Sequence, residues 1–279
     1  MSPSGHRIVL TGGGTGGHIY PALSVAEQLM GDHDVEAILY IGASKHPEER
    51  LARECGLDFV GLTVSGLPRS LSPRLLTWPG EMFGAIYKAR QILQKFRPTV
   101  VLGTGGYASA PPLAAANSLG IPTVVHEPDA HPGLVNRLMG QKAELISLGM
   151  QGAAGRMHSK SGRLAFNGNP VRMSFLGERK RDAGCAVLGL RSDLKNVLIT
   201  GGSQGAKALN DAVAGCLAKL LDIEPHLQVI HQCGDKNLND LKEQLPPGLA
   251  QSPRYHLRPY FDDLSMAYTP GVARVCMAI

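Results

Sequence analysis

The chain has 279 residues, of which 43% are hydrophobic and 18% are charged, and its formal net charge at pH 7 is +5. This composition excludes an intrinsically disordered chain, and the length suffices for two ordinary domains. The N-terminus lacks a signal-peptide pattern and no stretch reaches the ~18 apolar residues of a membrane span, so we expect any membrane contact to be peripheral. The five cysteines form no zinc or C-x-x-C spacing, which is typical of a reduced, cytoplasmic protein.

Short β-rich runs alternate with helical patterns in the first half of the chain. We predict strands over 7–11, 36–42, 58–64, 99–105, 122–127 and 144–149. A helix is expected over 20–30, where Leu23, Ala26 and Met30 share one face. Continuously apolar strands that are spaced by helices indicate a parallel sheet covered on both faces.

The same pattern restarts after the turn-rich segment 166–174. Further strands are predicted over 196–200, 228–233 and 254–260. We therefore predict an α/β protein of two Rossmann-like domains that face a cleft, with residues 1–168 in the first and 169–279 in the second.

Gly-rich loops follow three of the predicted strands. They are "TGGGTGGHIYP" (11–21), "GTGGYASAPP" (103–112) and "GGSQGA" (201–206). Glycines after a strand let the backbone approach a ligand, and the next helix N-terminus attracts an anion. The first loop has the Gly12-x-Gly14-x-x-Gly17 spacing of a dinucleotide site, but the strand over 36–42 ends without the acid that such a site needs. We favour other phosphate-bearing ligands; the alternative is that the glycines only permit tight turns.

Six segments together resemble the MurG family of bacterial glycosyltransferases. They are "GGTGGHIYPALSVA" (13–26), "VLGTGGYASAPPLAAANSLGIPTVVHE" (101–127), "GLVNR" (133–137), "GNPVR" (168–172), "TGGSQGAKALN" (200–210) and "YFDDLSMAY" (260–268). The resemblance implies an inverting GT-B enzyme of peptidoglycan synthesis. Such an enzyme moves N-acetylglucosamine from UDP-N-acetylglucosamine to undecaprenyl-pyrophosphoryl-MurNAc-pentapeptide, at the cytoplasmic face of the plasma membrane. The first domain would bind the lipid-linked acceptor and the second the UDP-sugar.

Sugar transfer needs a base for the acceptor hydroxyl, and His18 at the mouth of the first loop is the candidate. The alternative is a histidine that only orients the loop by hydrogen bonding. The substrate-binding residues expected in the first domain are Thr15, Gly16, Gly17, Gly105, Gly106, Tyr107, Glu127, Asp129 and Asn136. Asp129 departs from the family's HEQN pattern, because an acid that only accepts replaces an amide that can donate. For His126 and Glu127 the alternative is a hydrogen-bonded pair in the core.

In the second domain, the resemblance implies that Ser203, Gln204 and Gly205 hold UDP. Arg172 is expected to contact the donor, since a guanidinium suits a phosphate or a uracil carbonyl; a hinge salt bridge is the alternative. Phe261 is expected beside the uracil, with a core role as the alternative. We predict no protein-bound metal, because helix termini can hold the phosphates, although Mg²⁺ from solution can assist. No nucleic-acid partner is expected.

The segment 65–97 combines apolar anchors with basic neighbours, a pattern that suits the surface of an anionic membrane. The predicted membrane patch is Leu71, Leu75, Leu76, Trp78, Arg69 and Arg74. We expect the exposed share at 67–79, and part of 81–96 to pack on the sheet as an amphipathic helix.

The residues after Tyr268 read "TPGVARVCMAI", where the family continues into a loop resembling SGA-x-T-x-x-E whose acid binds the ribose of UDP. We therefore expect a C-terminally truncated member with impaired donor binding and a less stable second domain. The alternative function is a non-catalytic remnant that binds the lipid diphosphate and the membrane without transferring sugar.

Overall fold

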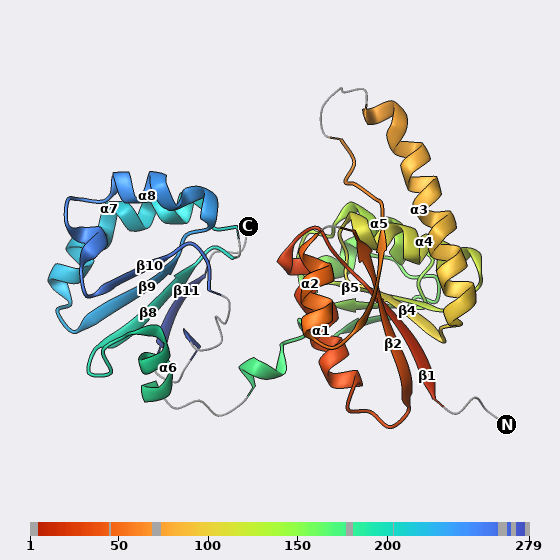
Figure 1. The fold of residues 1–279 in the computed structure, drawn as a ribbon, viewed down its shortest axis with the longest axis horizontal. Coiled ribbons are helices and arrows are strands. Elements are labelled where there is room, and N and C mark those ends of the chain that lie inside the picture. The colour runs from red at the N-terminus through yellow and green to blue at the C-terminus, as the bar shows by residue number, and fades with distance from the viewer. Residues whose placement is uncertain are drawn as a thin grey trace. The chain divides into compact units, whose positions relative to one another are not determined.

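The computed structural model describes residues 5–44, 46–68, 74–176, 181–202, 204–261, 267–268 and 272–276. The chain divides into two compact units, Met1–Met173 and Ser174–Ile279 (Figure 1). Each unit contains its own parallel sheet, and the predicted α/β class is confirmed. The short 3-10 helix Met173–Phe175 stands where one unit passes into the next.

The part of the first unit that the structure describes is built on seven parallel strands. They are β1 (His6–Thr11), β2 (Val35–Ala43), β3 (Asp58–Leu62), β4 (Val100–Gly103), β5 (Thr123–Glu127), β6 (Leu145–Leu148) and β7 (Leu164–Phe166), in the spatial order β3-β2-β1-β4-β5-β6-β7. Its helices are α1 (Gly16–Leu29), α2 (Pro47–Glu54), α3 (Arg74–Phe96), α4 (Ala110–Ser118) and α5 (Leu134–Gly140), with 3-10 turns at Tyr107–Ser109 and Gln151–Arg156. The strand order reverses between β1 and β4, the point where α/β sheets bind their ligands.

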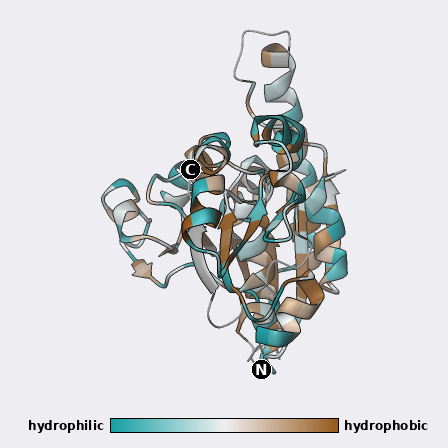
Figure 2. Cartoon of the chain, turned by 90° about the vertical axis from the view of Figure 1, so that its left-hand side faces the viewer, coloured by the Kyte–Doolittle hydropathy of each residue, from teal (hydrophilic) through white to brown (hydrophobic). Residues whose placement is uncertain are grey.

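Alternate residues of β1 serve two separate cores. Val9 packs with residues of α3 and α4 on one face, whereas Ile8 and Leu10 pack with residues of α1 and α2 on the other. A strand with both faces buried reads as a continuous apolar run, which is why these strands were predictable. In Figure 2 the hydrophobic residues gather on the strands, and hydrophilic ones lie on the outer turns of the helices.

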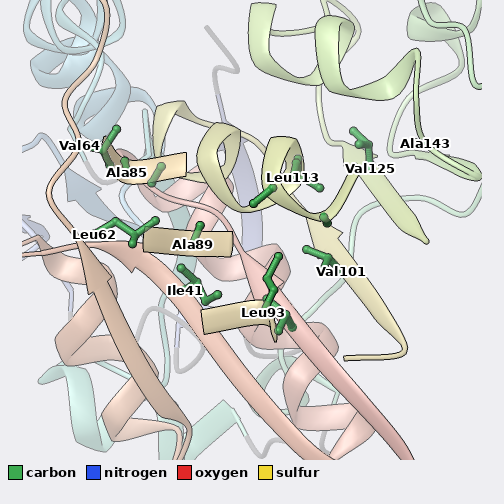
Figure 3. Close-up of a cluster of buried hydrophobic side chains, with 14 of the residues drawn as sticks. Ile41, Leu62, Val64, Ala85, Ala89, Leu93, Val101, Leu113, Val125 and Ala143 are labelled. Carbon is green, nitrogen blue, oxygen red and sulfur yellow. The ribbon is translucent and has the colours of Figure 1, made fainter. Parts of the chain in front are cut away.

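One side of α3 closes the first of these cores. Ala85, Ala89 and Leu93 follow one another at four-residue spacing and face the sheet, as Figure 3 shows. Two small side chains let the helix approach the strands closely, where it meets Ile41 and Leu62.

Among its described residues, the second unit has four parallel strands and helices on both faces of the sheet. The strands are β8 (Lys195–Thr200), β9 (Leu227–Gln232), β10 (Tyr255–Arg258) and β11 (Val272–Cys276), in the order β10-β9-β8-β11. The helices are α6 (Arg181–Leu188), α7 (Lys207–Ile223) and α8 (Leu238–Gln244), with 3-10 turns at Asp235–Asn237 and Leu249–Gln251. Figure 1 shows α7 and α8 on one face of the sheet and α6 on the other. Leu217 and Val229 are fully buried where α7 meets the sheet.

Three elements differ from the predictions. Helix α1 begins at Gly16 and not at residue 20, because Thr15 is the extended N-cap residue and Gly16 and Gly17 form the first turn. Strand β7 was not predicted, since its apolar run LAF is only three residues long. Strand β11 was also missed, and an arginine interrupts its short apolar sequence VARVC.

Candidate functional site

The first two Gly-rich loops pack directly on each other at the carboxyl ends of β1 and β4. The Gly13 amide donates to the Gly105 carbonyl at 3.2 Å, and the Thr104 hydroxyl donates to the His18 carbonyl at 2.5 Å. A Cβ on Gly106 would lie 1.8 Å from the Gly13 oxygen, and the φ of Gly106 is +77°. Glycine is therefore the residue that permits this contact. The two loops form one continuous surface.

His18 lies in the first turn of α1, and its ring rests against the second loop. Its Nδ1 is 3.1 Å from the Thr15 hydroxyl, and a Cβ on Gly105 would lie 2.7 Å from its Cδ2. Burial lowers the pKa of His18, and the charge of Asp129 partly offsets this by raising it. A lowered pKa keeps the imidazole neutral at pH 7, so one ring nitrogen can accept a proton.

Glu127 and Asn136 extend the site from the other side of Gly105. The buried Glu127 carboxylate accepts hydrogen bonds from Asn136 Nδ2 at 2.9 Å, from the Asp129 amide at 2.9 Å and from the Gly133 amide at 3.1 Å. Burial raises the pKa of Glu127, although these bonds act in the opposite direction. Asn136 Nδ2 would be 2.9 Å from a Cβ on Gly105, so the amide touches the same glycine as His18. We call His18, Gly105, Glu127, Asp129 and Asn136 the His18 site.

His126 and Glu127 are both buried and hydrogen-bonded, as the core alternative expected, but in the described structure they do not bond to each other. His126 instead lies 3.1 Å from the Ser147 hydroxyl and 3.2 Å from Asn169 Oδ1. Glu127 orders the chain that follows it, because two of its three donors are backbone amides. Asn136 Oδ1 is buried and has no partner within the described chain.

Tyr107 lies at the edge of the first loop. A Cβ on Gly14 would lie 2.8 Å from its ring, and its hydroxyl is 3.4 Å from His46 Nε2. Burial raises the pKa of Tyr107, and the charge of Glu48 adds to this increase. Thr15 and Gly17 are exposed and Gly16 is half-buried, so these residues stand at the surface of the loop.

Glu48 is a supporting residue that the sequence interpretation missed. It is fully buried in the first turn of α2, where Oε1 accepts from the Ala43 amide at 3.3 Å and Oε2 has no partner in the described structure. Oε1 also occupies the space that a Cβ on Gly13 would take. The acid was overlooked because an acid in the first turn of a helix is ordinarily an exposed charge that complements the helix dipole.

Side-chain amides of asparagine and glutamine hydrogen-bond to the Gly-rich loop of the second unit. Asn237 Nδ2 donates to the Gln204 carbonyl at 3.2 Å and to the Cys233 carbonyl at 2.8 Å. A Cβ on Gly205 would lie 1.7 Å from the same Cys233 oxygen. Gln232 joins this loop to the Phe261 segment, because its Nε2 donates to the Gly202 carbonyl at 2.9 Å and its Oε1 accepts from the Phe261 amide at 3.0 Å.

A buried polar chain lies behind that loop. His231 Nδ1 is 2.8 Å from the Tyr255 hydroxyl, and its Nε2 is 3.1 Å from Asn210 Oδ1. Asn210 Nδ2 in turn donates to the Cys233 carbonyl at 2.9 Å. Burial lowers the pKa of His231 to about 4. Polar residues inside the apolar strand sequence QVIHQC were the signal that could have revealed this network.

The remaining predicted site residues do not belong to the His18 site, or lie outside the described residues. Arg172 belongs to the first unit, and its guanidinium lies over the ring of Tyr20 on α1 at 4.6 Å from the centroid. Phe261 is half-buried against the core residues Leu198 and Ile230. Ser203 lies outside the described residues. Within the described part of the chain, no three histidine, cysteine or acidic side chains gather as metal ligands.

The predicted membrane patch is described only in part. Arg69 and Leu71 lie outside the described residues, as does the side chain of Arg74. Leu75 and Leu76 are exposed, whereas Trp78 is half-buried and its indole donates to the Ser65 carbonyl at 3.1 Å. The exposed apolar surface does not end at residue 79 as expected, because Phe83 is 73% exposed and Tyr87 64% exposed. Phe83 and Tyr87 are exposed because α3 is amphipathic and its buried face is occupied by Ala85 and Ala89.

No helix in the described ranges has the length and apolar character needed to cross a bilayer.

Comparison with known proteins places both units in one enzyme family. Residues 8–147 match the N-terminal domain of glycosyltransferase family 28, and residues 196–270 match its C-terminal domain. The UDP-N-acetylglucosamine–N-acetylmuramyl-(pentapeptide) pyrophosphoryl-undecaprenol N-acetylglucosamine transferase of Halothermothrix orenii is 41% identical over 94% of this chain and 71% of its own length. The enzyme of the same name from Desulfitobacterium hafniense is 39% identical over 86% of this chain and 64% of its own length.

A solved structure supports the fold. The crystal structure of Acinetobacter baumannii MurG superimposes with a TM-score of 0.64 at 24% identity, and the match covers 97% of this chain and 73% of that one. The predicted GT-B fold class is thus confirmed. The chain belongs to glycosyltransferase family 28 and, within it, to the MurG family of N-acetylglucosamine transferases.

Proposed function

We propose that this chain transfers N-acetylglucosamine from UDP-N-acetylglucosamine to undecaprenyl-pyrophosphoryl-MurNAc-pentapeptide, with inversion at the anomeric carbon. The observation that carries the proposal is His18, a neutral histidine held between two Gly-rich loops in a chain that is 41% identical to a transferase of that name. The first unit takes the lipid-linked acceptor, and the second unit takes the UDP-sugar.

In the proposed reaction, a hydroxyl of the acceptor sugar attacks the anomeric carbon of the donor sugar. The new C–O bond forms as the bond to UDP breaks, and UDP leaves with the bonding electron pair. His18 takes the hydroxyl proton at Nε2, while Nδ1–H donates to the Thr15 hydroxyl 3.1 Å away and fixes the tautomer. Asp129 favours the resulting imidazolium, because its negative charge raises the pKa of His18.

The other residues of the His18 site position the acceptor. Glu127 holds the backbone of residues 129 and 133 in place, and Asn136 keeps an amide beside Gly105. The unpartnered Oδ1 of Asn136 supports a role for this amide beyond packing, since a buried oxygen without a donor costs stability. In the second unit, the loop around Gln204 and Gly205 binds the UDP diphosphate, and Phe261 stays a predicted donor contact. Arg172, at the end of the first unit, also stays a predicted donor contact.

The test is release of UDP on incubation with UDP-N-acetylglucosamine and a lipid-linked muramyl acceptor. We expect His18→Ala to lower kcat by at least about 100-fold, the typical contribution of a general base. UDP binding, measured by calorimetry, should be unchanged in this variant. His33→Ala is the matched control, because His33 is exposed on the turn after α1.

Two results would overturn the assignment. Activity of His18→Ala within threefold of the parent would remove His18 as the base. Acceptor binding without any UDP release at high protein concentration would instead favour a remnant that binds without transferring.

We also propose that the chain works at the cytoplasmic face of the plasma membrane as a peripheral protein. The support is the exposed apolar stripe on α3, which includes Leu76 and Phe83. Leu76→Ser with Phe83→Ser should reduce sedimentation with anionic vesicles and leave transfer to a short-chain, water-soluble acceptor unchanged. Equal sedimentation of parent and variant would exclude this stripe as the membrane contact.

A further inference from the structure

A basic cavity lies in the first unit at the C-terminal end of α5. Its volume is about 510 Å³, and Arg137, Gln141, Arg156 and His158 line it. None of these residues belongs to the His18 site, although Arg137 follows Asn136 directly in the chain.

Local packing explains why these side chains converge. Gly140 ends α5, and a Cβ there would meet Ile146 and Met157 at 3.2 Å, so this end of the helix sits directly on the core. Met157 is buried in an extended conformation, with φ −121° and ψ 137°. Arg156 ends the preceding 3-10 turn and His158 follows Met157, so the buried methionine stands between two residues that face the surface. Both are exposed, beside Arg137 and Gln141.

The cavity is basic without internal compensation. Within the described residues, no hydrogen bond or ion pair engages the side chain of Arg137 or Arg156. Glu144, three residues after Gln141 in the chain, is paired with Lys160 at 2.7 Å. Two guanidinium groups and an imidazole around one space offer the donors that bind phosphate oxygens.

Exposed leucines lie on the same face of α5 as two of the residues that line the cavity. Leu134, Arg137, Leu138 and Gln141 recur at the spacing of one helical face, and Leu134 and Leu138 are 59% and 50% exposed. Exposed leucines on the same face as a cavity-lining arginine are the combination that suits an acyl chain beside a phosphate.

We propose that this cavity is a binding site for a phosphate group, separate from the Gly-rich loops, with Arg137 and Arg156 as its main donors. The phosphate comes either from the head group of an anionic lipid or from a free phosphate in solution. The site does not depend on sugar transfer, so its test is independent of the proposed enzymatic activity.

The experiment uses the full chain and two probes. The first is sedimentation with phosphatidylglycerol vesicles, with phosphatidylcholine vesicles as the uncharged-surface reference. The second is calorimetric titration with inorganic phosphate alone. The test variant is Arg137→Gln with Arg156→Gln, and the control is Arg163→Gln, because Arg163 is exposed and does not line the cavity.

We expect the double variant to bind phosphatidylglycerol vesicles about 25-fold more weakly than the parent, since each basic residue near an anionic surface contributes roughly a fivefold factor. The Arg163→Gln control should stay within twofold, and all melting temperatures should agree, because the altered side chains are exposed. Binding of inorganic phosphate that the double variant loses would assign the free anion as a ligand. Loss of vesicle binding without any phosphate binding would assign the lipid head group. Parent-like behaviour of the double variant with both probes would overturn the proposal.

Discussion

The two units hold their Gly-rich loops by different means. In the first unit, one loop braces another, and a half-buried histidine with a lowered pKa remains at the surface between them. In the second unit, asparagine side chains hold the loop, and the histidine behind it is fully buried in a closed hydrogen-bond chain. The first arrangement leaves a nitrogen free to accept a proton, whereas the second fixes a backbone surface. The difference matches the proposed division between an acceptor hydroxyl that must lose a proton in the first unit and a UDP group that the second unit holds.

The largest effect is expected where the two loops of the first unit touch. Gly106→Ala should lower the free energy of unfolding by about 3 kcal/mol, because φ +77° and ψ 162° is a conformation that only glycine adopts easily and the Cβ would meet the Gly13 oxygen. Gly120→Ala is the matched control: its φ is +71°, but nothing lies within 4 Å, so about 1 kcal/mol is expected. Urea unfolding followed by Trp78, the chain's single tryptophan, reports on the first unit. Equal losses in the two variants would show that the loops do not brace each other.

The second unit should lose stability as the pH falls from about 6.5 to about 4. Folded His231 has a pKa of about 4, whereas an unfolded histidine titrates near about 6.5, so between these values only the unfolded state takes up the proton. The stability is fully present above pH 6.5, and about 3 kcal/mol is lost on reaching pH 4. Amide hydrogen exchange of β8 and β9, followed as a function of pH, measures this loss of stability.

His231→Gln should remove this acid dependence, and the exposed His226→Gln should retain it. If the stability of His231→Gln still falls between pH 6.5 and pH 4, a group other than His231 carries the titration.

A smaller effect is expected from the asparagine that holds the second-unit loop. Asn237→Ala removes two hydrogen bonds to carbonyl oxygens, so the local opening free energy of residues 204–206 should fall by about 1 kcal/mol per bond. Amide exchange at these residues is the measurement, and the exposed Asn239→Ala is the control. Protection that is equal in the two variants would assign the loop's rigidity to Gly205 packing alone.

The smallest effect concerns the tuning of His18. Asp129→Asn should lower the pKa of His18 further, because it removes the charge that raises that pKa and leaves burial, the larger cause, in place. The acid limb of the pH profile of kcat/KM should therefore move to lower pH, and an NMR titration of the His18 ring should follow it. Asp34→Asn, at an exposed position in the turn after α1, should leave both unchanged. A rise in the pKa of His18 in Asp129→Asn would contradict the role given to Asp129.

The sequence by itself determined the strands with two buried faces, the positions of the three Gly-rich loops and the family. The local sequence predicts these features, because a buried parallel strand is a continuous apolar run. A loop that packs closely against another backbone segment also requires glycine. His18 could be singled out for the same reason, since it directly follows such a loop.

Only the tertiary structure decided which residues meet. Glu127 binds Asn136 and two backbone amides and not its neighbour His126, because β5 and α5 bring positions nine residues apart into contact. Glu48, Gln232 and Asn237 support the loops from other elements, and the local sequence does not identify the partners of these side chains. The basic cavity also arises from packing, since burial of Met157 beneath the end of α5 places Arg156 beside Arg137 across nineteen positions of sequence. Periodicity records which side chains are buried, but the partners of a polar side chain depend on how the elements are packed in space.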